Sequence, residues 1–417
     1  SYLRVIRTIK PTDTMKGAIW SPIVASAACL VRAAPVDVDA DIIPNQFIVQ
    51  LRPGISATSV LEHHQVVREL HSRSLSRRDG VFSGLGKTFS AGDFNAYAGS
   101  FDGATITEIA ALPEVLKVEP ERWVHPAALI TQTGVEWHLG SISHRAENST
   151  EYIYDDSAAE GTFAYVVDSG IRWSHEDFEG RASHGYNAVN GSENGDQMGH
   201  GTHVASILAG KMYGVAKKAT VIDVKVFGSG SASSGTILDG ITWAINDIVA
   251  NNRQHLSVIN LSLGGGGSDV LDNAVKSIYN QAILPVCAAG NENTDVSTRS
   301  PGRTPECLTV GNVESSLKRF YIEGASSGSN YGEAVDIFAP GTDIVAASSQ
   351  SDSAIVSSIG TSDAAPAVAG IALYLQRLEG LATPDEVTSR IIELSTKDVV
   401  KEARGSQNRL AYNGNAL

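Results

Sequence analysis

Three short segments, far apart in the chain, carry the residue types of nucleophilic catalysis. Asp168 begins an Asp-Ser-Gly segment, His200 begins a His-Gly-Thr-His segment, and Ser362 ends a Gly-Thr-Ser segment. A serine hydroxyl is a poor nucleophile unless an imidazole accepts its proton, and that imidazole needs a carboxylate to fix its tautomer and stabilise its charge. The sequence can fill all three roles, so we expect an Asp/His/Ser triad.

Zinc binding is the rival interpretation of the second segment, because His200 and His203 lie close together in the sequence. Two zinc ligands on one helix face are typically four positions apart and accompanied by a glutamate base, and this segment has neither feature. Taken singly, Asp-Ser-Gly is usually a turn and Gly-Thr-Ser is usually a helix cap. The prediction of a triad therefore depends on the three segments occurring together.

The segments are set in a pattern typical of a doubly wound, mostly parallel α/β sheet. From Thr162 onward, apolar strand patterns alternate with helical periodicity. The expected strands are 163–167, 221–226, 258–261, 284–289 and 308–312, and the expected helices include 237–249, 270–278 and one capped by Thr383. Functional groups of such sheets gather at the carboxyl ends of the strands, where Asp168 falls. No Gly-x-Gly-x-x-Gly follows the first strand, which argues against a nucleotide site.

The N-terminal part has a different pattern, which predicts a small α+β unit. Strands are expected at 47–51, 94–101 and 115–120, and helices from about 56 and at 104–112. The stretch 72–92 is rich in Ser, Arg and Gly, so it is expected to be an exposed connection. His64 lies on the apolar face of the first helix, and we expect it to be packed rather than catalytic.

With these motifs, the chain resembles the proteinase K-type members of the subtilisin family of serine peptidases, from about Ile42 to Tyr412. The resemblance also rests on the segments 261–265, 288–291, 329–332 and 336–341. It implies a subtilisin-like fold in which Asp168 orients, His200 is the general acid/base and Ser362 is the nucleophile. The implied activity is endopeptidase hydrolysis of protein peptide bonds through an acyl-enzyme.

The resemblance implies further site residues. Asn291 would donate its side-chain amide to the oxyanion of the tetrahedral intermediate; in isolation, an asparagine after Gly290 also suits a turn or a helix C-cap. An extended substrate would add as a strand along exposed edges. The residues implied in substrate binding are Ser262, Leu263, Gly264, Ala289 and Gly290, with 230–232 as the second edge.

A structural calcium ion is implied in the same way, with the carbonyls of Pro305 and Cys307 and the carboxylate of Asp336 as ligands. Oxygen ligands suit calcium. Carbonyl ligands have no side-chain signature, so the alternative that Asp336 only ends a strand stays open. No catalytic cofactor is expected.

The implied organisation is that of a self-processing zymogen. Residues 41–124 resemble an inhibitor propeptide with a ferredoxin-like α+β fold, and residues 128–417 form the peptidase domain, with the cut expected between His125 and Leu129. The apolar stretch after Met15 has the form of a signal peptide, expected to span 15–33 and to direct secretion to the extracellular space. The alternative is a buried or anchoring helix. Residues 1–14 precede that methionine and are expected to be a gene-model artefact.

The net charge of the chain limits the classes of binding partner that we expect. The formal net charge of −14 over 417 residues argues against the basic surface that supplies most nucleic-acid affinity. We expect protein and peptide substrates and the chain's own propeptide as partners, no nucleic acid, no membrane, and a monomer. Three cysteines allow at most one bridge, between Cys287 and Cys307, if Cys29 leaves with the leader.

Two positions depart from the family pattern, which usually has methionine after the nucleophile and histidine after the helix proline. This chain has Asp363 and Ala367 there. An ionised Asp363 that points inward opposes the developing oxyanion, whereas one that points outward complements the positive end of the helix. Two functions therefore stand: an active secreted endopeptidase, and a silent homologue that binds peptides or its propeptide without cleavage. The intact triad positions and Asn291 favour the first.

Overall fold

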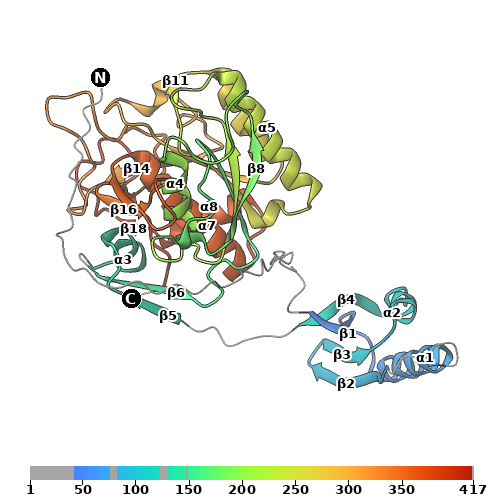
Figure 1. The fold of residues 1–417 in the computed structure, drawn as a ribbon. Helices are drawn as coiled ribbons and strands as arrows, with labels where there is room; N and C mark the ends of the chain where they lie inside the picture. Colours follow the sequence, from blue (N-terminus) through green and yellow to red (C-terminus); the bar gives the residue numbers. More distant parts are fainter. Residues whose placement is uncertain (1–41, 76–81, 123–128, 147–148, 416–417) are drawn as a thin grey trace, which may run out of the picture. The chain divides into compact units, whose positions relative to one another are not determined.

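Figure 1 shows the computed structural model of the chain, which describes residues 42–75, 82–122, 129–146 and 149–415. Several predictions fall outside the described residues. They concern the segment 1–14, the leader 15–33 with Cys29, and most of the cut region, 125–128. Within the described ranges, no helix combines the length and the apolar character needed to cross a membrane.

Residues 42–122 form a βαββαβ unit. Its elements are β1 (Ile42–Leu51), α1 (Ala57–Leu75), β2 (Gly84–Ala91), β3 (Phe94–Ser100), α2 (Gly103–Ala110) and β4 (Val115–Arg122). The strands pair antiparallel in the order β2-β3-β1-β4, which is the ferredoxin-like arrangement. The predicted small α+β unit is confirmed.

The prediction of an exposed connection over 72–92 is wrong at both ends. Helix α1 continues to Leu75, and residues 84–91 form β2. This strand pairs with β3 as a hairpin, with Ala91 opposite Phe94. The sequence of β2 has few β-branched or aromatic residues, so pairing with β3, rather than local propensity, makes it a strand.

His64 lies in the packed interior of this unit. It is 7% exposed, and its ring meets the ring of Tyr97 edge-on at a centroid distance of 5.4 Å. Val67 and Leu70 of the same helix contribute to the core beside it. Burial lowers the pKa of His64, which favours the neutral imidazole there. The prediction that His64 is packed is confirmed.

Residues 129–415 form the larger unit around a nine-stranded sheet in the order β18-β19-β15-β14-β12-β10-β7-β9-β8. The strands of this unit include those of the large sheet and of the two-stranded sheets β5-β6, β11-β13 and β16-β17. They are β5 (Leu129–Thr133), β6 (Glu151–Asp155), β7 (Phe163–Asp168), β8 (Ala182–Asn187), β9 (Thr220–Lys225), β10 (Ser257–Leu261), β11 (Gly265–Gly266), β12 (Leu284–Ala288), β13 (Arg299–Ser300), β14 (Leu308–Val313), β15 (Ile337–Pro340), β16 (Ile344–Ala347), β17 (Ile355–Ser358), β18 (Thr396–Lys397) and β19 (Arg409–Leu410). Its helices are α3 (Trp137–Ser143), α4 (His200–Ala209), α5 (Ser234–Ala250), α6 (Asp269–Asn280), α7 (Thr361–Glu379) and α8 (Pro384–Leu394). All neighbours in the large sheet are parallel except β18 and β19.

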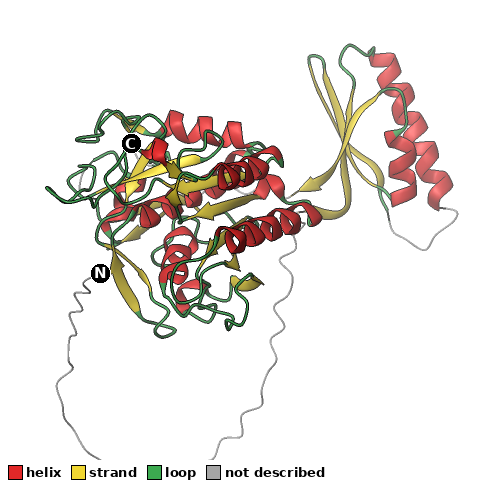
Figure 2. Cartoon of the chain, turned by 90° about the horizontal axis from the view of Figure 1, so that it is seen from above, coloured by secondary structure: helices red, strands yellow, loops and turns green. Residues whose placement is uncertain are grey.

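The interior strand β7, third from the β8 edge of the sheet, faces a hydrophobic core on each side. Ala164 and Val166 belong to the core that includes α4 and α7, whereas Tyr165 and Val167 belong to the core that includes α5 and α6. Figure 2 shows helices on both sides of the yellow strands. A sheet buried on both faces explains why its strands are almost continuously apolar. The predicted doubly wound, mostly parallel sheet is confirmed.

The parallel strands bring the segments of chemical interest to one edge of the sheet. Strands β7, β10 and β12 are neighbours, so their carboxyl ends lie together. β7 ends at Asp168, β10 ends before Ser262, and β12 ends before Ala289. Helices α4 and α7 pack against each other, and they begin at His200 and Thr361.

One local prediction is also confirmed, because Thr383 caps α8 through a capping box with Glu386. The bridge that the sequence left open is formed: Cys287 near the end of β12 and Cys307 just before β14 form a disulfide, which covalently links two neighbouring parts of the sheet.

Candidate active site

Strand β7 and helix α4 position an Asp–His pair. Oδ1 of Asp168 lies 2.7 Å from Nδ1 of His200, and the backbone N–H of Ser169 also donates to that oxygen. The Asp168 side chain is 1% exposed and that of His200 is 30% exposed. The contact favours the tautomer with the proton on Nδ1, which leaves Nε2 able to accept one.

Gly201 permits this close approach of strand and helix. A Cβ atom on Gly201 would lie 2.2 Å from the carbonyl oxygen of Gly170 and 3.2 Å from Oδ1 of Asp168. A side chain would therefore collide with the backbone after β7 and crowd the carboxylate that contacts the imidazole. This contact explains why glycine follows the histidine in the second segment.

Asp196 also holds the site together, and the sequence reasoning missed it. Its Oδ1 accepts hydrogen bonds from the Ser169 hydroxyl and from the backbone N–H of Gly199, and its Oδ2 accepts from Thr202. It thus caps the start of α4 and ties that helix to the loop after β7. The available signal was an acidic residue just before a helix start, where it satisfies free N–H groups.

Ser362 and Asn291 converge on one point. Ser362 lies in the first turn of α7, and Asn291 lies in the loop after β12. A Cβ atom on Gly360 would lie 2.9 Å from Oγ of Ser362 and 3.5 Å from Nδ2 of Asn291. The missing side chain of Gly360 leaves room between a hydroxyl and an amide donor.

The orientation of Asn291 is set by the next helix. Its Oδ1 accepts from the backbone N–H of Thr361 at 2.8 Å and from the Thr361 hydroxyl at 3.0 Å. Asn330 steadies the loop, because its Nδ2 donates to the Ala289 carbonyl and its Oδ1 accepts from the N–H of Glu292. With its oxygen engaged by Thr361, Asn291 keeps its amide N–H groups for the side of Ser362. The alternative that Asn291 is only a turn residue does not explain this orientation.

The electrostatics of His200 favour its charged form. Burial lowers the pKa, but the charge and hydrogen bond of Asp168, followed by the charges of Asp363 and Asp196, outweigh burial and raise the pKa to about 9. A general base must be neutral to accept a proton. This imidazole therefore gains that capacity at alkaline pH.

Asp363 points into the protein. Its side chain is 1% exposed, and its Oδ1 lies 3.5 Å from Nε2 of His203. Burial raises the pKa of Asp363 to about 7, which favours the neutral acid at lower pH. The alternative in which Asp363 turns outward is therefore wrong, because its carboxyl is packed between α7 and α4. Ala367, the second departure, is fully buried in the core.

The zinc interpretation gains no support from the described part of the chain. Among those residues, no group of three or more His, Cys, Asp or Glu side chains is placed to hold a metal ion. His200 contacts Asp168, whereas His203 faces Asp363. The two histidines therefore have separate partners.

The predicted substrate-binding residues border the Ser362 region. The Ser262 hydroxyl donates to the backbone carbonyl of Ser362 at 3.0 Å, which joins the end of β10 to α7. Leu263 is buried, and Gly264 is exposed just before β11. Ala289 and Gly290 form the loop that leads to Asn291, and the segment 230–232 lies in the largely exposed connection between β9 and α5.

Asp336 lies immediately before β15 and not at the end of a strand. The N–H of Thr309 in β14 donates to its Oδ2 at 2.8 Å, and Cys307 lies just before that strand. Burial raises the pKa of Asp336 to about 6. A nearby cation would offset that cost, and a carboxylate with the carbonyls of Pro305 and Cys307 is an all-oxygen donor set. These residues fit calcium.

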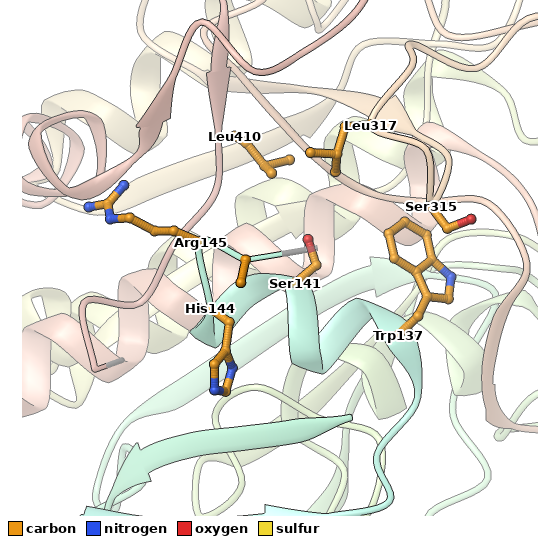
Figure 3. A pocket seen from close by; sticks show the side chains of 8 residues that line it. Trp137, Ser141, His144, Arg145, Ser315, Leu317 and Leu410 are labelled. Atoms are coloured by element: carbon orange, nitrogen blue, oxygen red, sulfur yellow. The ribbon is translucent and has the colours of Figure 1, made fainter. Parts of the chain in front are cut away.

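A separate pocket, shown in Figure 3, contains two further serines and another histidine. It is lined by Trp137, Ser141, His144, Arg145, Ala146, Ser315, Leu317 and Leu410. The His144 ring points away from the Ser141 hydroxyl, and its Nδ1 lies 2.9 Å from the hydroxyl of Ser143. This pocket therefore offers no second nucleophile–base pair.

Comparisons with known proteins agree with this geometry. A model of the subtilase family matches residues 160–412, and a model of the peptidase inhibitor I9 family matches residues 46–127. Alkaline protease 1 of Aspergillus flavus is 46% identical over 415 residues, covering 99% of this chain and 100% of that protein. Alkaline proteinase of Hapsidospora chrysogena is 47% identical over 394 residues, covering 92% of this chain and 95% of that protein. The crystal structure of a cold adapted subtilisin-like serine proteinase has a TM-score of 0.61 and 37% identity, covering 67% of this chain and 99% of that structure.

Proposed function

Because the chain belongs to the subtilase family, we propose that it is a serine endopeptidase in which Ser362 is the nucleophile, His200 the general acid/base and Asp168 the orienting carboxylate. The observation that carries this proposal is the 2.7 Å Asp168–His200 contact at the strand edge where Ser362 and Asn291 converge.

The proposed reaction follows from these positions. His200 accepts the proton of the Ser362 hydroxyl as its oxygen attacks the substrate carbonyl, while Asp168 stabilises the resulting imidazolium. The amide of Asn291 donates to the oxyanion of the tetrahedral intermediate. His200 then protonates the leaving amine, and water hydrolyses the acyl-enzyme by the same steps. An extended substrate would align along Ser262–Gly264 and 230–232.

The chain is a zymogen, since an I9-type inhibitor unit precedes the subtilase unit. The finer organisation is part of the proposal. Cleavage between His125 and Leu129 would release a peptidase that begins near β5, and the mature monomer would act outside the cell. Supporting the extracellular site are the signal-like sequence at 15–33 and the Cys287–Cys307 disulfide, because disulfides persist in oxidising compartments.

Covalent labelling tests the activity directly. A fluorophosphonate probe is expected to label the mature protein at one site, Ser362, because only an activated serine reacts quickly. Mass spectrometry of the labelled peptide identifies the residue. A homologue that binds peptides without cleaving them would remain unlabelled under conditions in which a control peptidase reacts. That result would refute the proposed activity.

We also propose that Pro305, Cys307 and Asp336 hold a structural calcium ion. Ligands that bind only the folded state add stability of about 2.7 kcal/mol at 100 times Kd. In the Ser362→Ala background, which prevents autolysis, the melting temperature is expected to rise by several degrees between EGTA and millimolar calcium. Asp336→Asn should remove most of this increment, and magnesium should not replace calcium. Equal melting curves with EGTA and calcium would refute the site.

A further inference from the structure

A second carboxyl group is buried behind the nucleophile. Asp363 follows Ser362 in the first turn of α7, which packs against α4 (Figure 1). Its side chain is 1% exposed and faces His203, which is 4% exposed, with Oδ1 and Nε2 3.5 Å apart. Neither oxygen of Asp363 has a hydrogen bond of ordinary geometry. A buried carboxyl with so few partners is costly to keep for packing alone.

The groups that contact Asp363 or influence its charge come from three other elements. They are His203 and His200 on α4, Asp168 on β7 and Ser358 on β17. Two further groups act on those histidines: Asp196 on His200 and His138 on His203. Among the described residues, no lysine or arginine forms an ion pair with Asp363. An ionised Asp363 is therefore favoured by the imidazolium of His200 and by the Ser358 hydroxyl, and the charge of Asp168 opposes it. Burial lowers the pKa of His203 to about 4, so His203 faces Asp363 as a neutral ring.

Asp363 is buried close to His200, because His203, which it faces at 3.5 Å, follows His200 by about one turn of α4. The electrostatic interaction between Asp363 and His200 is mutual. The imidazolium of His200 favours the ionised form of Asp363, and the ionised Asp363 favours the imidazolium, as Asp168 also does. The low-dielectric surroundings keep this interaction from being screened by solvent and salt. His200 thus experiences a second negative charge in addition to its direct partner.

We propose that Asp363 is a second acidic residue that acts on His200 and displaces the working range of this peptidase toward alkaline pH. It is a positioning residue in the electrostatic sense, because it acts through His200 and does not reach the substrate. The inference rests on the proposed roles of His200 and Ser362.

The sign follows from protonation. Below neutral pH, Asp363 is largely protonated and adds little charge. As pH rises, it ionises and stabilises the imidazolium, so His200 becomes neutral only at higher pH. Since the neutral imidazole accepts the proton of Ser362, the rising limb of kcat/KM against pH moves upward. Removing the carboxylate should move that limb down.

The test is the pH profile of kcat/KM for a small chromogenic peptide, with Asp363→Asn and Asp363→Ser beside the wild type. Both variants remove the charge, one at nearly constant volume and one with a smaller side chain, so a folding defect in one leaves the other informative. The rising limb is expected to shift down by roughly half a unit to one unit. One unit below the wild-type midpoint, the variants should therefore be roughly three- to fivefold faster, relative to their own plateaus. KM should change little, because Asp363 is buried.

Asp223 offers a matched control. It is also a fully buried aspartate with a pKa raised to about 7 by burial, and it accepts hydrogen bonds from Trp173 and Ile171. It is not among the groups that act on His200. Asp223→Asn should leave the rising limb in place.

The outcomes separate the inference from the function on which it rests. Superimposable limbs for wild type, Asp363→Asn and Asp363→Ser overturn the inference while leaving the peptidase intact. A uniform loss of kcat at every pH, with an unmoved limb, marks a purely structural role and also overturns it. A wild type that neither hydrolyses peptides nor reacts with a fluorophosphonate overturns the proposed function and this inference together.

Discussion

The Ser362→Ala chain is expected to accumulate without its N-terminal segment being removed and to lack peptidase activity. Alanine removes the hydroxyl that would attack the carbonyl, while the Asp168–His200 contact remains. The expected loss in kcat is about a million-fold, the size found when the nucleophile of a subtilisin is removed. Peptide hydrolysis measures the activity, and intact-mass spectrometry shows whether the chain is cut between His125 and Leu129.

Ser357→Ala is the matched control. Ser357 is an exposed serine on β17, five residues before the nucleophile position. Produced in the same host, that variant should be processed and active, so a defect confined to the Ser362→Ala chain reports the loss of that one hydroxyl. An unprocessed Ser362→Ala chain in that host also shows that host peptidases do not make the cut. If the Ser362→Ala chain is processed normally and hydrolyses peptides, Ser362 is not the nucleophile.

Asn291→Ala is expected to lower kcat by about 100- to 1,000-fold with little change in KM, the range found for an oxyanion donor of subtilisin. The amide donates only to the charge that develops in the transition state, so ground-state binding of the peptide should be nearly unaffected. Steady-state kinetics on a small peptide gives both constants. The nucleophile remains, so the variant should still process itself, only more slowly.

Because Oδ1 of Asn291 accepts from Thr361, the alanine variant also loses a structural contact. Asn291→Asp retains an oxygen for Thr361 but removes the donor, and its kcat should fall at least as far. Asn280→Ala, at an exposed asparagine that ends α6, should behave as wild type. A kcat for Asn291→Ala within a few-fold of wild type would contradict the oxyanion role.

Periodicity located five neighbouring strands of the large sheet, β14, β12, β10, β7 and β9, because they are buried on both faces. The strands nearer the two edges, β8, β15, β18 and β19, were not predicted. The segment predicted at 163–167 is β7, Phe163–Asp168, and that predicted at 308–312 is β14, Leu308–Val313. Continuous apolar runs of this kind are strong local signals. The smaller unit was harder to predict, because the composition of β2 indicates a loop. The two-residue Gly92-Asp93 turn between β2 and β3 was the available hairpin signal.

Some residues of the candidate site could be predicted from the sequence and others could not. Asp168, His200 and Ser362 were predicted from local motifs, and the parallel sheet brings their segments to one edge. Asp196 was not predicted, since its importance lies in hydrogen bonds to Ser169 and Thr202. Local sequence patterns do not predict hydrogen bonds of this kind.

By itself, the sequence determined which residue types are available for chemistry, the order in which they occur, and the sheet that must carry them. Local composition and periodicity are sufficient for that. Only the tertiary structure decided that Cys287 meets Cys307, and that Asp363 turns inward toward His203. The pKa values of His200 and Asp363 were likewise decided only by the tertiary structure. They depend on burial and on charges that arrive from remote segments, so they exist only once α4, α7 and β7 are packed together.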